Sequence, residues 1–225
     1  MIKILFIGNS FTYFNDLPKM LEKIACESGQ DIYCDSVTKG GAYLHQYADA
    51  NDELGIRFSE AKEKEEWDYA VIQDQSFNPI NNTEDFENSA FSLCKRLENC
   101  KKIFFYQTWA YKDGSEKLEK TGLSYNEMYK GLKKAYSDTA KKVRGIIVPV
   151  GDSFKKIKEN HPEIEIYKED SFHPNVLGTY LSACTFYAFM FNKSPENLSV
   201  PQDIDNSIAK IMQKTVMEVY NEHHS

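Results

Sequence analysis

Short apolar segments alternate with longer amphipathic segments along the whole of this 225-residue chain. The apolar runs are typical of buried strands, and the segments between them repeat apolar residues with the period of a helix. The expected strands are residues 2–7, 32–36, 69–73, 103–107 and 145–150. The expected helices are 17–25, most of 43–64, 84–97, 124–143, 153–160, 175–191 and 204–222. This alternation predicts an α/β fold, a three-layer α/β/α sandwich around a doubly wound, flavodoxin-like, five-stranded parallel sheet.

Composition limits the classes of protein to which the chain can belong. No repeat, low-complexity segment or linker divides it, so residues 1–225 are expected to form a single domain. The net charge of −7 is accompanied by no basic stripe, which argues against a nucleic-acid partner. The sequence does not determine the oligomeric state.

The cysteines and the N-terminal segment indicate the compartment. The five cysteines are odd in number and have no C-x-x-C spacing, so free thiols are expected, with no disulfide and no metal site. The apolar run at the N-terminus is too short for a signal peptide or a membrane span, and no other segment approaches the length of a span. We therefore expect a cytoplasmic protein with no membrane partner, unless a leader peptide has been removed.

Two polar motifs far apart in the sequence suggest nucleophilic chemistry. Ser10 directly follows the first expected strand, and Asp170 and His173 lie in a polar loop before a long helix. A serine hydroxyl is a weak nucleophile until a histidine accepts its proton, and the histidine needs an acid to fix its tautomer. These residue types therefore match a Ser-His-Asp hydrolase.

Further polar and glycine residues follow the other strands. Gly40 and Gly41 follow the second strand, the segment 73–76 follows the third, and Gln107 and Trp109 follow the fourth. Each of these alone is more commonly a turn, a helix cap or a loop. Because the carboxyl ends of parallel strands meet at one edge of the sheet, their common placement favours a shared site.

The ordered blocks resemble those of the SGNH (GDSL-like) hydrolase family over nearly the whole chain. The first block is similar to residues 7–12, the glycine block to 38–42, the third block to 73–76 and the last block to 170–175. Asn9 stands where the family usually has Asp, and Gln75 stands where it has the Asn of the oxyanion hole. The resemblance therefore implies a variant branch of the family.

The resemblance also implies roles for individual residues. Ser10 would be the nucleophile, His173 the general base and acid, and Asp170 the residue that orients His173. The oxyanion hole would consist of the Ser10 N–H, the Gly40 N–H and the Gln75 side chain, with Gly41 and Gln73 as the respective alternatives. The residues expected to contact substrate are Asn9, Gly41, Gln107 and Trp109. No metal and no cofactor is implied.

A second serine motif, Gly151-Asp152-Ser153, spells the family signature more literally. An amphipathic stretch begins there, so Asp152 or Ser153 is interpreted as a helix N-cap. No glycine or amide block follows Ser153, and the nucleophile is therefore assigned to Ser10.

The function favoured by the sequence is an esterase that removes a small O-acyl group, with O-acetyl on a carbohydrate as the leading substrate. A lysophospholipase or thioesterase is the enzymatic alternative. A non-catalytic ligand-binding module and a flavodoxin-like nucleotide or flavin binder are the others, and the last leaves Asp170 and His173 unexplained. Core packing is expected for Tyr13, Phe14 and Tyr43 rather than substrate contact, and His223 is expected at a fraying terminus.

Overall fold

The computed structural model describes residues 1–225 and contains one all-parallel sheet of five strands. The strands are β1 (Ile2–Gly8), β2 (Ile32–Thr38), β3 (Tyr69–Ile72), β4 (Lys102–Tyr106) and β5 (Ile146–Val148). Their spatial order is β2-β1-β3-β4-β5. The predicted doubly wound parallel sheet is therefore confirmed, with the flavodoxin-like strand order.

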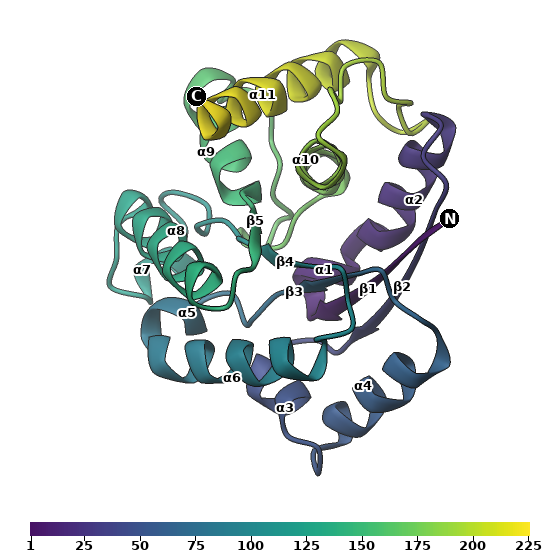
Figure 1. The fold of residues 1–225 in the computed structure, drawn as a ribbon. Helices are drawn as coiled ribbons and strands as arrows, with labels where there is room; N and C mark the ends of the chain where they lie inside the picture. The colour runs from purple at the N-terminus through teal and green to yellow at the C-terminus, as the bar shows by residue number, and fades with distance from the viewer.

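Helices cover both faces of the sheet (Figure 1). Those above it in Figure 1 are α2 (Leu17–Glu27), α9 (Val150–Asn160), α10 (Val176–Phe191) and the outermost helix α11 (Asn206–His224). Those on the other side are α3 (Leu44–Ala48), α4 (Glu53–Lys64) and α6 (Thr83–Arg96), with α8 (Tyr125–Lys142) towards the β5 edge. The short helices are α1 (Ser10–Tyr13), the 3-10 turn η1 (Phe14–Asp16), α5 (Asn78–Asn81) and α7 (Glu116–Glu119).

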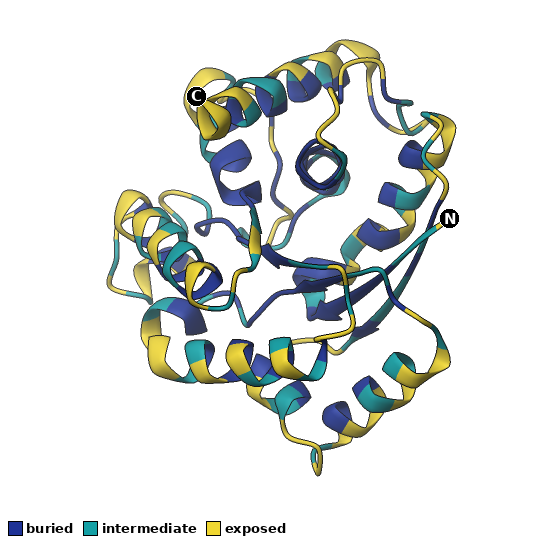
Figure 2. Cartoon of the chain, in the orientation of Figure 1, coloured by how far each residue is buried: buried dark blue, intermediate teal, exposed yellow.

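The core lies on both faces of the sheet, and many of its side chains are completely buried. Residues 4–7 of β1 are all completely buried, which explains why this strand reads as a continuous apolar run rather than an alternating one. Helix α10 is buried on almost every side because α2, α9 and α11 surround it (Figure 2). An all-round apolar helix of this kind is expected only in an interior position.

Some expected boundaries were wrong for identifiable reasons. The segment 43–64, most of which was expected to be helical, forms the two helices α3 and α4. Strand β5 ends at Val148 because α9 already begins at Val150, with Pro149 in the N-cap position. Helices α1, α5 and α7 each have only four residues, too few to show a helical period in the sequence. Asn175 is the N-cap of α10, and its side-chain oxygen accepts from the Gly178 N–H at 3.0 Å.

The strand order places a crevice between β1 and β3. The chain leaves β1 towards β2 on one side and leaves β3 towards β4 on the other. In open α/β sheets, ligands bind at such a switch point, outside the carboxyl ends of the strands. Ser10 lies two residues beyond β1, and Gln73 directly follows β3.

Candidate active site

The turn that carries Ser10 is held from three directions. The Asn9 side chain caps α1, since its Oδ1 accepts from the Phe11 N–H at 3.1 Å. Its Nδ2 donates to the carbonyl of Ala42 at 3.0 Å, which ties this turn to the segment after β2. The Gln73 Oε1 accepts from the Asn9 N–H at 2.9 Å. The packing leaves no room for a side chain at Gly8, where a Cβ would lie 2.6 Å from the same Gln73 oxygen.

Ser10, His173 and Asp170 form a continuous hydrogen-bonded chain. Ser10 Oγ lies 2.8 Å from His173 Nε2, and His173 Nδ1 lies 2.7 Å from Asp170 Oδ2. The other carboxylate oxygen of Asp170 accepts from the backbone N–H groups of Phe172 and His173. Partial burial alone would raise the pKa of Asp170, but hydrogen bonds from the His173 side chain and these N–H groups lower it below its usual value. Asp170 is therefore an anion that can hold the histidine in the tautomer protonated on Nδ1.

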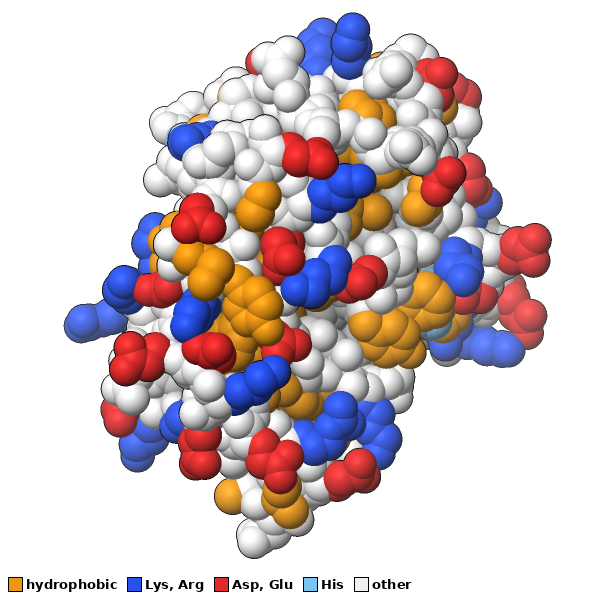
Figure 3. Space-filling view, turned by 90° about the vertical axis from the view of Figure 1, so that its right-hand side faces the viewer, with side chains coloured by type: hydrophobic (Ala, Val, Ile, Leu, Met, Phe, Trp, Pro, Cys, Tyr) orange, Lys and Arg blue, Asp and Glu red, His pale blue; other side chains and the backbone are white.

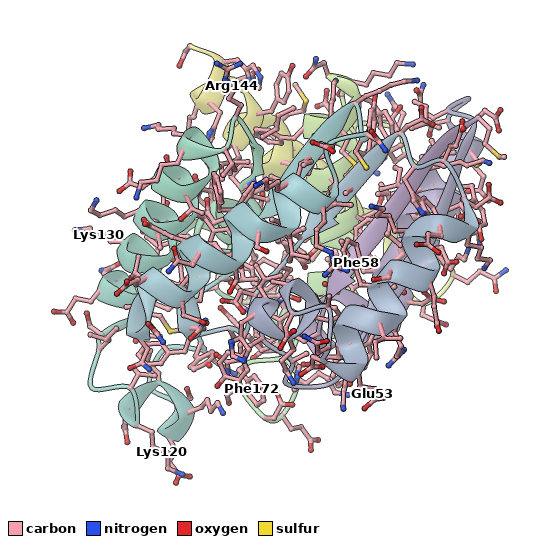
Figure 4. The ribbon with its side chains drawn as sticks, turned by 60° about the horizontal axis from the view of Figure 1, so that its bottom comes forward. Glu53, Phe58, Lys120, Lys130, Arg144 and Phe172 are labelled. Carbon is pink, nitrogen blue, oxygen red and sulfur yellow. The ribbon has the colours of Figure 1, made fainter.

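Trp109 contacts the segments that carry the two ends of this hydrogen-bonded series, Ser10 and the His173 loop. Its ring is stacked between Phe11, the residue after the nucleophile, and Phe154 of α9, at centroid distances of 4.6 and 4.0 Å. Its Nε1–H donates to the carbonyl of Phe172 at 3.0 Å, in the loop that carries His173. Figure 4 shows Phe172 in this loop, at the same edge of the molecule as Lys120, which follows α7.

Asn15 makes a second link between the segment that follows Ser10 and the loop that carries His173. Its Nδ2 donates to the carbonyl of Pro174 at 3.1 Å and to the Thr179 hydroxyl at 2.8 Å. Asn15 and Asp16 directly precede α2. Asp16 occupies the cap position without a side-chain hydrogen bond, and Asn15 instead positions the His173 loop.

Two backbone segments carry the N–H groups that the sequence predicted for an oxyanion hole. Ser10 is the first residue of α1, where backbone N–H groups have no acceptor within the helix. After β2, the Ala42 N–H bonds to the carbonyl of Lys39 at 3.1 Å and closes a turn through Gly40 and Gly41. Gly41 has a φ of +70°, the value that favours glycine at the third position of a type II turn. This turn conformation accounts for the glycine at position 41.

The Gln75 side chain is oriented by the start of α5. Its Oε1 accepts from the backbone N–H groups of Phe77 at 2.8 Å and Asn78 at 3.1 Å. The amide NH₂ of Gln75 is left as a donor. Gln73, the alternative, is completely buried, and its oxygen also accepts from the Thr12 hydroxyl at 2.9 Å, so it supports the nucleophile turn.

Asp74, which the sequence did not single out, joins two of the loops. Its Oδ1 accepts from the Leu44 N–H at 2.8 Å and from the Gln75 N–H at 2.7 Å, and its Oδ2 accepts from Asn78 Nδ2 at 2.7 Å. Asp74 is completely buried, and burial raises its pKa to about 6. A charged side chain between two uncharged residues in a loop gives no sequence signal of such burial.

Three residues expected to contact substrate lie in the interior instead. Asn9, Gln107 and Trp109 are only 2, 2 and 0% exposed. Their polar groups bond within the protein, and Gln107 Nε2 donates to Asp152 Oδ1 at 2.9 Å. These residues do lie near the carboxyl ends of strands, as predicted, but their side chains point into the interior and pack there.

The second serine motif is structural. Ser153 is completely buried, and its hydroxyl lies 2.9 Å from the Thr185 hydroxyl of α10. Burial alone would raise the pKa of Asp152, but hydrogen bonds from His223, Lys133 and Gln107 lower it to about 2. The N-cap role expected for Asp152 or Ser153 was wrong, since both lie inside α9. His223 was also misjudged, because it bonds to Asp152 at 2.8 Å.

SGNH-type, GDSL-like hydrolases have this strand order, and their first and last sequence blocks meet at one edge of the sheet. Solved structures confirm the resemblance. A "putative SGNH hydrolase" from Slackia heliotrinireducens is 26% identical, with a TM-score of 0.75 over 84% of this chain and 98% of its own. An acetylxylan esterase from Geobacillus stearothermophilus is 17% identical, with a TM-score of 0.62 over 84% of this chain and 94% of its own.

The chain belongs to the family described as Domain of unknown function (DUF4886), whose model matches residues 48–219. A crystal structure of a DUF4886 family protein from Bacteroides uniformis is 20% identical, with a TM-score of 0.85 over 100% of this chain and 96% of its own. No curated protein sequence matches this one. The matched residues include Asp170 and His173 and begin after Ser10.

Three further observations concern metal ligands, surface charge and membrane-spanning helices. No group of three or more His, Cys, Asp or Glu side chains is arranged to hold a metal ion. Basic and acidic side chains are interspersed over the face that contains α2 and α4 (Figure 3). None of the helices has both the length and the apolar character needed to cross a membrane.

Proposed function

We propose that this protein is a serine esterase that hydrolyses a small O-acyl ester through an acyl-enzyme on Ser10. The observation that carries the proposal is the hydrogen-bonded chain from Ser10 Oγ through His173 to Asp170, with distances of 2.8 and 2.7 Å. Nucleophile, base and orienting acid lie within the range required for proton transfer before any substrate is bound.

The reaction proceeds in two halves. Ser10 Oγ attacks the ester carbonyl while His173 Nε2 accepts the hydroxyl proton, and Asp170 stabilises the resulting imidazolium. The negative charge on the former carbonyl oxygen is stabilised by the Ser10 N–H, the Gly40 N–H and the Gln75 amide. His173 then gives its proton to the departing alcohol. A water molecule repeats the sequence on the acyl-enzyme, releasing the carboxylic acid and restoring Ser10.

The proposed substrate is an acetyl ester of a carbohydrate. Proteins named acetylxylan esterase are among those of the same fold, so the fold accommodates this chemistry. We further propose a cytoplasmic location, since all five cysteines are unpaired thiols, as is usual in a reducing compartment.

The decisive experiment combines a substrate panel with labelling. Acetyl, butyryl and longer-chain chromogenic esters are assayed with wild type, Ser10→Ala and the matched control Ser153→Ala. Hydrolysis is expected to favour acetyl, to vanish in Ser10→Ala and to persist in Ser153→Ala. A fluorophosphonate probe should label Ser10 when the modified peptide is mapped by mass spectrometry.

Three outcomes would overturn parts of the proposal. A preference for long acyl chains would support the lysophospholipase or thioesterase alternative. Labelling at Ser153 would overturn the choice of nucleophile. Neither hydrolysis nor labelling under any condition would favour a binding module that retains the fold.

A further inference from the structure

Tyrosine exposure is confined to two positions. The chain has 14 tyrosines, and only Tyr13 and Tyr43 are classed as exposed, at 41 and 36%. Neither hydroxyl takes part in a hydrogen bond within the protein, whereas those of Tyr47 and Tyr167 bond to buried carbonyls. The sequence favoured core packing for both residues, and the structure contradicts this. Two tyrosines left exposed at one place are a feature of binding surfaces rather than of cores.

Both tyrosines lie at the proposed catalytic centre. Tyr13 is the last residue of α1, whose first residue is Ser10, and its hydroxyl reaches the Cβ position of Gly40 at 3.0 Å. Tyr43 follows Gly41 by two residues and precedes α3. Figure 3 shows hydrophobic side chains gathered beside a histidine at the right-hand edge of the view. The Tyr13 hydroxyl thus borders the turn of residues 39–42, and Tyr43 directly follows this turn in the chain.

Each ring is already held in place. Tyr13 stacks on Phe14 at a centroid distance of 5.5 Å, and Phe14 lies 4.3 Å from the ring of His173. Tyr43 stacks on His45 at 5.3 Å, and His45 Nδ1 lies 3.1 Å from Asp85 Oδ2. Rings that are oriented before binding lose little conformational entropy when a ligand arrives.

We propose that Tyr13 and Tyr43 form a subsite for the sugar ring of the ester, on the alcohol side of the scissile bond. The inference rests on the proposed esterase function. An aromatic face is electron-rich and attracts the C–H groups on the flat face of a pyranose, and the free phenol hydroxyls match its hydroxyl groups. A long alkyl chain could contact only the aromatic faces, whereas a carbohydrate could also hydrogen-bond to the phenol hydroxyls. We therefore expect a carbohydrate at this subsite.

The test compares two acetate esters that share the acyl group and differ in the alcohol. A mono-O-acetylated methyl xyloside presents a pyranose ring with free hydroxyl groups, and ethyl acetate presents neither a ring nor a hydroxyl group. Release of acetate is followed by pH-stat titration for wild type, Tyr13→Ala, Tyr43→Ala and the double variant. Phe91→Ala is the matched control, since Phe91 is 60% exposed on α6 and lies outside the site.

The expected result is a change in the ratio of the two activities. Each single variant should lower kcat/KM for the xyloside relative to ethyl acetate by about fivefold, mainly through KM, because one aromatic contact is removed. Tyr43→Phe should recover most of the loss, since it keeps the ring. Phe91→Ala should leave the ratio unchanged. Equal losses on both esters would overturn the subsite and assign the tyrosines to the folding of the site.

A binding measurement separates this inference from the proposed function. In the Ser10→Ala background, binding of the intact xyloside ester is measured by saturation-transfer NMR, with and without Tyr43→Ala. Binding that Tyr43→Ala weakens supports the subsite even if no ester is hydrolysed. Hydrolysis of ethyl acetate together with xyloside binding that is indifferent to both tyrosines would refute the subsite while leaving the esterase in place.

Discussion

Asp74 gives the sharpest test of the electrostatics around the site. Its carboxyl is buried, and its pKa is about 6 in the folded protein against an ordinary value of 3.8. A raised carboxyl pKa means that the folded state binds the proton more tightly than the unfolded chain does. Burial of the charge therefore destabilises the protein at neutral pH, and this cost disappears as the pH falls through 6 towards 3.8.

The magnitude follows from proton linkage. Between about pH 7.5 and about pH 4.5, uptake of this one proton should stabilise the wild type by about 2 kcal/mol relative to a variant that cannot titrate there. Asp74→Asn is such a variant, and its amide oxygen still accepts from the Leu44 and Gln75 N–H groups. The assay is urea unfolding of both proteins at several pH values. The free energy of unfolding of the wild type minus that of Asp74→Asn should rise by this amount towards acid pH.

Asp170→Asn is the matched control because the pKa of Asp170 is lowered rather than raised. The stability that its ionised form contributes is present above its unfolded pKa and is lost only below it. The corresponding difference for Asp170 should therefore stay nearly constant over the same pH range. A wild-type minus Asp74→Asn difference that is flat, or that shrinks towards acid pH, would refute the assignment of Asp74 as a carboxylate destabilised by burial.

Four further outcomes follow from the site. Gln75→Glu keeps the oxygen that accepts from the start of α5 but removes the amide donor. The value of kcat should therefore fall by about a hundredfold or more with little change in KM. An unchanged kcat in steady-state assays would place the donor elsewhere. Trp109→Phe keeps an aromatic ring but loses the hydrogen bond to the Phe172 carbonyl. The value of kcat should fall, while the thermal unfolding temperature should shift only slightly. An unaffected kcat would contradict a role of this hydrogen bond in positioning His173. Asp152→Asn should lower stability by about 2 kcal/mol at neutral pH, since the pKa of about 2 keeps Asp152 ionised there. An unchanged free energy of unfolding in denaturant titrations would count against the network. EDTA should leave hydrolysis unchanged, and inhibition restored by added metal would point to different chemistry.

The order and type of the main elements could be predicted from the sequence because they depend on local patterns. A run such as Ile4–Ile7 is apolar at every position because the strand is buried on both faces, and this is visible without any partner. The placement of Ser10 after β1 and the spacing of Asp170 and His173 are equally local. The Asp170 carboxylate bonds to His173 three residues away, a contact that one loop can make by itself.

Tertiary structure alone decided which way side chains point and which distant residues meet. The 2.8 Å separation of Ser10 and His173 joins residues 163 positions apart, and it depends on the packing of α10 and on the bonds of Trp109 and Asn15. Gln73 and Gln75 are identical residues two positions apart, and in an extended strand both side chains would lie on one face. Strand β3 ends at Ile72, however, and the Gln75 side chain bonds to the start of α5, so Gln73 is buried and Gln75 is partly exposed.

The same reason separates the two serine motifs and the tyrosines. Ser10 and Ser153 both follow strands in similar sequence contexts, but helix α10 covers Ser153 and leaves Ser10 accessible to His173. Tyr13 and Tyr43 resemble the twelve other tyrosines in the sequence, and only the packing of the sheet edge leaves them uncovered. The burial of a residue depends on which other parts of the folded chain pack over it. The local sequence around the residue does not contain this information.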